Sequence, residues 1–186
     1  MAERPGRTEV LMRQAQVVAT RSTCTRAQVG VVIAHAGRVV SQGYNGAPAG
    51  MPHCDHTCHC GVARGAAPVC SPGCRFIKAG GWHSPDCAFE VWSNYEAHDG
   101  DCPAETIGCQ TAVHAEANAI AFAARHGVAT DNAALYTTLS PCLACSQLII
   151  NAGITRVYML AEYRDNAGVE LLRKAGVGIL PWSFPA

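Results

Sequence analysis

Two short stretches constrain the fold of this 186-residue chain more than any other feature. Residues 114–116 (HAE) and residues 141–145 (PCLAC) each open a run with helical character. They place an imidazole, a carboxylate and two thiols at helix N-termini, where backbone N–H groups stabilise negative charge. His114, Cys142 and Cys145 suit one zinc ion that keeps a fourth position open for water. A chain with this site brings two helix starts together.

Length and composition fit a single domain over residues 1–186, because 49% of the residues are apolar and can form a sizeable core. Basic and acidic residues balance at 14 each, so the chain has no long-range attraction to nucleic acid phosphates or anionic membranes. Its sequence contains no membrane-spanning apolar run, and its first ten residues lack the apolar stretch of a signal peptide. We therefore expect a cytoplasmic protein that binds neither nucleic acid nor membrane.

The first 50 residues predict a helix and a hairpin. Residues 8–22 have apolar positions at helical spacing, with Thr8 as the expected N-cap. Residues 28–34 and 38–44 are rich in β-branched side chains and predict two strands joined by a tight turn. A loop dense in glycine and proline follows at residues 45–50.

Regular alternation begins at residue 114. We expect helices over 114–126, 142–152 and 166–175, and strands over 134–139, 156–161 and 177–180. Gly127, Gly153 and Gly176 follow the three helices, as C-terminal glycines do. Together with the hairpin this predicts a three-layer α/β fold, a five-stranded mixed sheet with helices on both faces and parallel strands in its last part.

The region from about 51 to 110 differs in character, because its apolar periodicity almost disappears. It contains eight of the eleven cysteines and five of the eight histidines. Disulfides are rare in a reducing compartment, so such clusters favour metal ligands. A bound ion can organise a segment that has too little apolar surface of its own. We interpret the region as a Cys/His-rich, zinc-stapled insertion in the domain.

The two opening stretches supply the parts of a hydrolytic deamination. A zinc ion held by His114, Cys142 and Cys145 lowers the pKa of its bound water toward about 7, which makes that water the nucleophile. Glu116 is the expected proton shuttle between the water, the ring nitrogen and the leaving amine. The alternative is a zinc ion that only staples the fold, with Glu116 as an uncommon fourth ligand.

The order H-x-E followed by P-C-x-x-C is the signature of zinc-dependent base deaminases. Beyond it, residues 28–33 (QVGVVI), 43–50 (GYNGAPAG), 114–120 and 136–142 make the chain resemble the deoxycytidylate (dCMP) deaminases. The resemblance covers roughly residues 8–54 and 109–180. It implies a cytidine-deaminase-like fold and the reaction of dCMP with water to give dUMP and ammonia, which supplies dUMP for thymidylate synthesis.

The resemblance also implies contacts with the nucleotide. Asn45 is expected to hydrogen-bond the sugar, and Ala115 and Glu116 to meet the edge of the base. Tyr163 matches an aromatic position that packs near the substrate. Two positions on the helix over 114–126 match family positions near the nucleotide, Phe122 and Arg125. Arg125 could equally stabilise the C-terminus of its own helix.

The family resemblance further implies regulation and assembly. Many family members are homohexamers that are activated by dCTP and inhibited by dTTP, with Mg bound to the triphosphate. The loop that contributes to their effector site corresponds here to Gly43, Tyr44, Asn45 and Gly46. We therefore expect a hexamer with a triphosphate effector site at these residues.

Some family members hold a second, structural zinc. Cys24, Cys54 and Cys109 fall where those members place ligands, and His98 or Cys102 is the candidate fourth ligand. The remaining cysteines exceed the needs of one ion, and spacings such as that of Cys58 and Cys60 are plausible for zinc. We expect a further zinc within residues 56–87. Its candidate ligands are Cys58, Cys60, Cys70, Cys74, Cys87 and His83, and the alternative is that several of these are thiols without metal.

Other functions stay open from the sequence. A related zinc deaminase could act on a 5-substituted dCMP, on a free cytidine or deoxycytidine, or on a base within a nucleic acid, although the balanced charge disfavours the last. A zinc-stapled binding or regulatory protein without activity is the alternative outside the enzymes. The presence of Glu116 argues against it.

Overall fold

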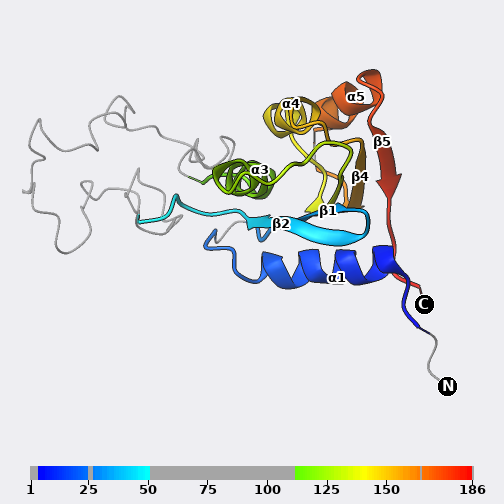
Figure 1. Ribbon diagram of the computed structural model, residues 1–186, viewed down its shortest axis with the longest axis horizontal. Coiled ribbons are helices and arrows are strands. Elements are labelled where there is room, and N and C mark those ends of the chain that lie inside the picture. The colour runs from blue at the N-terminus through cyan, green and yellow to red at the C-terminus, as the bar shows by residue number, and fades with distance from the viewer. Residues whose placement is uncertain (1–3, 25–26, 51–111, 164, 186) are drawn as a thin grey trace, which may run out of the picture. The chain divides into compact units, whose positions relative to one another are not determined.

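A computed structural model describes residues 4–24, 27–50, 112–163 and 165–185, all within one compact unit formed by residues 1–55 and 111–186. The insertion predicted at about 51–110 lies outside the described residues, and it stays a prediction. Figure 1 shows the arrangement of the described helices and strands.

The sheet begins with the predicted hairpin. Strands β1 (Gly30–His35) and β2 (Arg38–Tyr44) pair antiparallel through a two-residue turn. Both turn residues have positive φ, 50° at Ala36 and 77° at Gly37, which is the geometry that matches the twist of a hairpin. A β-bulge between Ile33 and Ala34 shifts the register close to this turn.

Three more strands complete the mixed sheet. Strand β3 (Ala134–Leu139) pairs antiparallel with β1, whereas β4 (Arg156–Ala161) and β5 (Gly178–Pro181) continue in parallel. The strand order is β2-β1-β3-β4-β5. The five-stranded mixed sheet predicted from the sequence is therefore confirmed, with each strand within two residues of its expected bounds.

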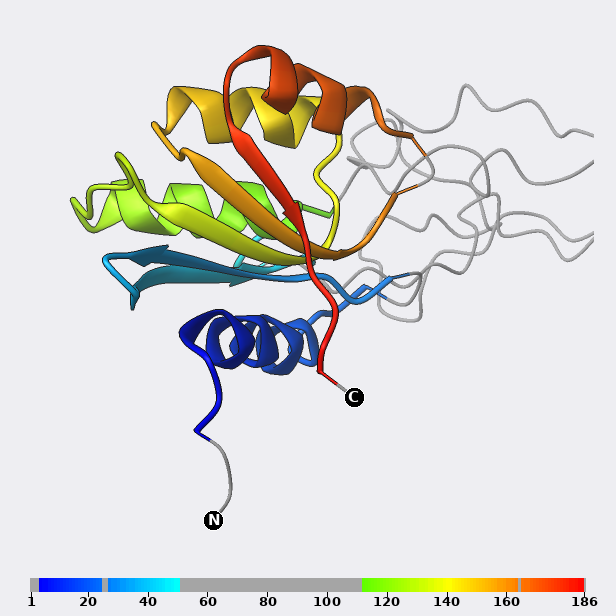
Figure 2. The same cartoon turned by 90° about the vertical axis from the view of Figure 1, so that its right-hand side faces the viewer.

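Helices cover both faces of this sheet. Helix α1 (Arg7–Ala19) lies on one face, and α3 (Ala115–Arg125), α4 (Leu143–Asn151) and α5 (Ala167–Lys174) lie on the other (Figures 1 and 2). Alternate residues of β1 enter the two cores: Val32 packs on the α1 side and Val31 on the opposite side. None of the helices in the described residues is long and apolar enough to cross a membrane.

The core on the α1 face is closed by residues that follow β5. Trp182 and Phe184 pack against the buried cluster formed by α1, β1 and β3, and the guanidinium of Arg13 lies 5.1 Å from the centre of the Phe184 ring. Figure 2 shows this segment passing from β5 toward α1. Within the same cluster the rings of Tyr136 and Tyr158 stack at 4.6 Å.

The glycines that follow three of the helices confirm the predicted pattern, whereas the bounds of the first helix differ from the prediction. Gly127, Gly153 and Gly176 have positive φ of 64°, 71° and 80° just after α3, α4 and α5, as expected of C-terminal glycines. The expected N-cap was wrong for the first helix, because Gly6 occupies that position and Thr8 lies inside α1. This helix also ends at Ala19 rather than at residue 22.

Close backbone packing fixes the start of α3 on β2. A Cβ atom added at Gly43 would overlap the carbonyl oxygen of Ala115 and the amide nitrogen of Ala119. Two side chains reinforce this approach: Ser41 Oγ donates to the carbonyl oxygen of Ala119 at 2.6 Å, and Asn118 Nδ2 donates to that of Tyr44 at 2.7 Å. The position of α3 therefore depends on Gly43 of β2, because only a residue without a side chain lets the helix approach so closely.

We predict that Gly43→Ala destabilises the protein by about 1–3 kcal/mol, the usual cost of overpacking a tight contact. Urea-induced unfolding measures the change. Gly178→Ala is the matched control in a strand, since a Cβ there makes only ordinary contacts of 3.5 and 3.6 Å. Equal stability of the two variants would contradict the close packing of β2 on α3.

Candidate metal centre

Two helix starts bring the predicted ligands together. His114 is the N-cap of α3, Cys142 is the N-cap of α4, and Cys145 lies in the first turn of α4. The chain before His114 is held to the loop after β2, because Val113 and Gly46 exchange backbone hydrogen bonds of 2.9 and 3.1 Å. Each ligand is thus fixed by secondary structure on the same face of the sheet.

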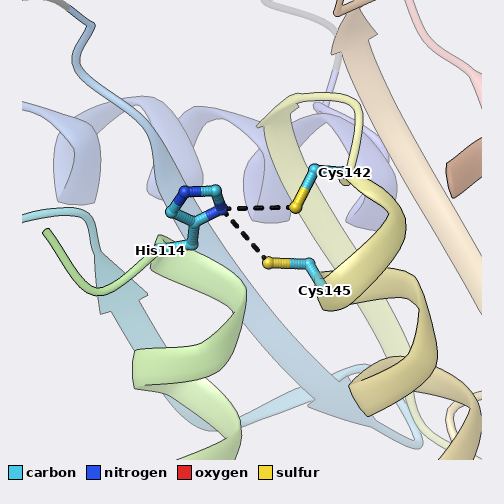
Figure 3. A group of neighbouring side chains, drawn as sticks. All are labelled: His114, Cys142 and Cys145. Carbon is cyan, nitrogen blue, oxygen red and sulfur yellow. Dashed lines mark hydrogen bonds between the residues drawn. The ribbon is translucent and has the colours of Figure 1, made fainter. Parts of the chain in front are cut away.

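The three side chains point at one another (Figure 3). His114 Nδ1 lies 3.4 Å from Cys142 Sγ and 3.4 Å from Cys145 Sγ, and all three ligand atoms lie within 4.8 Å of one another. With Zn–N of about 2.0–2.1 Å and Zn–S of about 2.3 Å, the N–S edge of a zinc tetrahedron is about 3.5 Å. The donor set and its spacing therefore fit zinc, and three protein ligands leave a fourth position open.

The two thiols differ in their tendency to ionise. Hydrogen bonds from Cys145 and His114 lower the pKa of Cys142 to about 4. The pKa of Cys145 is raised instead, first by its hydrogen bond to the Cys142 sulfur and then by burial, since only 2% of the residue is exposed. Cys142 is therefore the thiol that ionises first, while Cys145 keeps its proton. A cation bound between them would neutralise two thiolates.

A buried carboxyl completes the group. Glu116 lies in the first turn of α3, two residues after His114, and is only 4% exposed. Burial raises the pKa of its carboxyl, an effect opposed by a hydrogen bond from its own backbone N–H and by the charge of His114. A carboxyl whose pKa is raised holds a proton more readily than a free carboxyl, which suits a group that must accept and return one as general base and acid.

A family model for the cytidine and deoxycytidylate deaminase zinc-binding region matches residues 6–161. The chain belongs to this deaminase family. Its residues His114, Cys142 and Cys145 form the candidate zinc site that the family description leads one to expect.

Relatives of this deaminase match over nearly the whole chain. A deoxycytidylate deaminase of Enterobacteria phage T2 is 32% identical over 188 residues, which is 91% of this chain and 88% of that protein. ComE operon protein 2 of Bacillus subtilis is 32% identical over 95% of this chain and 71% of its own length. The solved dCMP deaminase of cyanophage S-TIM5, in complex with dCMP and dUMP, is 24% identical with a TM-score of 0.64; it covers 97% of this chain and 100% of that one, and shows the shared fold.

The side chain of Asn45 is held by one side-chain and two backbone groups of the deaminase. Its Oδ1 accepts hydrogen bonds from Ser22 Oγ at 2.7 Å and from the Val29 amide at 2.8 Å, and its Nδ2 donates to the carbonyl oxygen of Ala27 at 2.8 Å. Asn45 is 8% exposed. Its expected hydrogen bond to a sugar stays a prediction, and one N–H of the amide is the group that would make it.

The other expected substrate residues lie at different distances from the centre. Ala115 is buried at the start of α3, next to His114, and Tyr163 follows β4 at the sheet edge from which Cys142 emerges. Phe122 is exposed and contacts His126 near the other end of α3, six residues or roughly 9 Å beyond Glu116. Arg125 is exposed in the last turn of the same helix, where its positive charge can stabilise the helix C-terminus.

The expected effector residues lie along β2 and the loop that follows it. Gly43 is buried against α3, Tyr44 is partly buried and Gly46 pairs with Val113. Their role toward an effector stays a prediction. Of the expected structural-zinc ligands, the described residues include only Cys24, which is buried. The others lie outside the described residues: Cys54, Cys58, Cys60, Cys70, Cys74, His83, Cys87, His98, Cys102 and Cys109.

Sequence reasoning missed the residues that support the ligands. Ser41 and Asn118 tie β2 to α3, and Ser140, directly before the proline of the second motif, accepts a hydrogen bond from the Tyr163 amide at 2.6 Å. The position of Ser140 beside the motif could have indicated a supporting role. No sequence feature indicates that its partner is the Tyr163 amide, 23 residues later. These contacts exist only because distant segments pack together.

We predict that zinc binding at pH 8 releases about one proton from the Cys145 thiol for each ion bound at this site, in addition to the proton lost by the metal-bound water, because metal coordination requires both thiolates and only Cys145 still carries its proton. Calorimetric titration of metal-free protein in two buffers with different ionisation enthalpies gives the number. The Cys145→Ser variant, which lacks this thiol, provides the comparison. Equal proton release by the wild type and by Cys145→Ser would contradict the assignment of this proton to Cys145.

Proposed function

We propose that this deaminase converts dCMP and water to dUMP and ammonia. One observation carries the proposal: the starts of α3 and α4 place a His/Cys/Cys ligand group beside a buried carboxyl, Glu116. The choice of dCMP among cytosine compounds is supported by relatives named deoxycytidylate deaminases, which match at least 91% of this chain in phages T2 and T4. A chain with equal numbers of acidic and basic residues is better suited to a small nucleotide than to a polynucleotide.

The proposed chemistry divides between the metal and the chain. Zinc, when bound, makes a water molecule nucleophilic at neutral pH. His114, Cys142 and Cys145 would hold the ion, and the buried Glu116 would accept a proton from the attacking water. Glu116 would give this proton to the ring nitrogen while the water oxygen bonds to the carbon that carries the amine. The same carboxylate would then take the second proton from that oxygen and pass it to the amine, so that the C–N bond breaks, ammonia leaves and the oxygen remains as a carbonyl. The raised pKa of Glu116 suits both steps, because one group must first accept and then donate.

Further parts of the proposal concern surroundings and regulation. We retain Asn45, Ala115 and Tyr163 as substrate neighbours; Ala115 and Tyr163 are supported by their places beside the ligand-bearing helix starts. Phe122 and Arg125 have an exposed position that suits contact with a second copy of the chain better than contact with the base. A cytoplasmic homohexamer, regulated by dCTP and dTTP with Mg, is retained on the family resemblance.

We predict that Glu116→Gln lowers kcat on dCMP by at least about 10²–10⁴-fold, the range that general acid–base catalysis contributes, while zinc content stays unchanged. The fall in ultraviolet absorbance on deamination measures the rate. Glu170→Gln is the matched control, since Glu170 lies in the first turn of α5 and is exposed. Activity on dCMP that survives Glu116→Gln would contradict the mechanism.

The same assay tests the substrate. Parallel measurements use dCMP, 5-methyl-dCMP, deoxycytidine and single-stranded DNA, and we expect the highest kcat/KM for dCMP. A higher value for another compound would replace dCMP as the substrate. No turnover of any of them by zinc-loaded protein would favour the binding or regulatory alternative.

We predict more than one zinc per chain by elemental analysis of the purified protein, as the cysteines and histidines of residues 51–110 require. Cys142→Ser with Cys145→Ser should remove one zinc and leave the others in place. A stoichiometry of one zinc per wild-type chain, lost in this double variant, would contradict both expected structural sites while leaving the catalytic site intact.

A further inference from the structure

The turn that carries Cys142 is held by the segment after β4. Residues 140–142 connect the end of β3 with the start of α4. The Ser140 amide donates to the carbonyl oxygen of Ala161 at 2.9 Å, and Ser140 Oγ accepts from the Tyr163 amide at 2.6 Å. The backbone of Ser140 thus fastens this turn to the end of β4, and its side chain fastens it to the segment that follows.

The first turn of α5 presses on the same turn at Gly168. A Cβ added there would lie 2.7 Å from the carbonyl carbon of Cys142 and 2.7 Å from Ser146 Oγ, and it would overlap the carbonyl oxygen of Pro141. Gly168 has no positive φ, so its backbone conformation would accept alanine. Glycine also weakens a helix relative to alanine. The missing side chain therefore serves the contact with the turn.

This contact is with the backbone of Cys142, which is itself a candidate metal ligand. The carbonyl group of Cys142 accepts the first hydrogen bond of α4, from the Ser146 amide at 2.9 Å. A displacement of that carbonyl would move the Cys142 sulfur and also the first turn of α4, which contains Cys145. His114 would stay in place, because it belongs to α3 and is fixed by β2. The two Nδ1–Sγ distances of 3.4 Å would then change.

We propose that Gly168 is a positioning residue of the metal centre: it lets α5 seat directly on the Pro141–Cys142 backbone, and Ser140 Oγ fastens the same turn from its other side. The inference concerns the zinc site on which the proposed function rests. It assigns to α5, which contributes no ligand, the control of where both thiolates lie relative to His114.

The test uses the full-length protein loaded with Co²⁺, whose thiolate charge-transfer and d–d absorption bands report ligand geometry without any substrate. The spectrum of the Cys142→Ser, Cys145→Ser double variant is subtracted, so that the bands of this site are separated from those of the expected structural sites. Gly168→Ala should shift these bands and lower zinc affinity by about 10–100-fold in competition with a chromophoric chelator, as for other residues that support metal ligands. Gly178→Ala, at an uncrowded glycine, should match the wild type in both measurements. Circular dichroism confirms that each variant is folded.

A second substitution separates backbone displacement from side-chain crowding. Within the described residues Ser146 Oγ is buried without a hydrogen-bond partner, and Ser146→Ala removes the one side-chain atom among the three atoms nearest to the added Cβ. The backbone atoms of Pro141 and Cys142 still block it, and we expect Gly168→Ala with Ser146→Ala to keep the shifted cobalt spectrum. Restoration of the wild-type spectrum in this double variant would overturn the proposal that α5 acts through the backbone of the turn.

Ser140 keeps the proposal testable if Gly168→Ala does not fold. Ser140→Ala removes the acceptor of the Tyr163 amide and should weaken zinc binding, whereas Ser140→Thr keeps the hydroxyl and should restore it. Wild-type affinity and cobalt spectra in both Gly168→Ala and Ser140→Ala would overturn the positioning role alone. Absence of thiolate bands in the wild type would overturn the zinc site and, with it, the proposed function.

Discussion

The structure depends on two helix starts that lie side by side on one face of the sheet. Neither start is free to adjust. Helix α3 is seated on β2 by the missing side chain of Gly43 and by the hydrogen bonds of Ser41 and Asn118. Helix α4 emerges from β3, and β1 separates β2 from β3 in the sheet. The spacing between His114 and the two cysteines is therefore set by strand order, and the site inherits the rigidity of the sheet.

This rigidity holds together groups that would otherwise repel or be costly to bury. Two thiols and a carboxyl share a small volume, and the site responds by ionising one sulfur, protonating the other and raising the pKa of Glu116. A divalent cation allows both sulfurs to ionise, because it can neutralise both thiolates at once. The same burial that makes the carboxyl costly gives it a proton affinity suited to proton transfer.

Most of the fold could be predicted from the sequence, because the apolar periodicity and the glycines at turns and helix ends indicate the same bounds for nearly every element. The sequence also predicted His114, Glu116, Cys142 and Cys145, since their spacing is itself the chemical signal. It could not predict Ser140 or Gly168 as supports, because each acts on a partner that only tertiary packing brings close. Asn45 illustrates the same limit: the family resemblance implied a ligand contact, whereas three of its hydrogen bonds fasten Ser22, Ala27 and Val29. Thr8 was a plausible cap by type, but the helix begins earlier.

The packing of Trp182 and Phe184 against α1 has a consequence for the order in which the protein can fold. Synthesis proceeds from the N-terminus, so the apolar face of α1 is made first and its last cover is made at the end of the fold. All three metal ligands precede β4, α5 and β5 in the chain and are therefore synthesised before them. The histidine and the two thiols are thus made before part of the scaffold that spaces them.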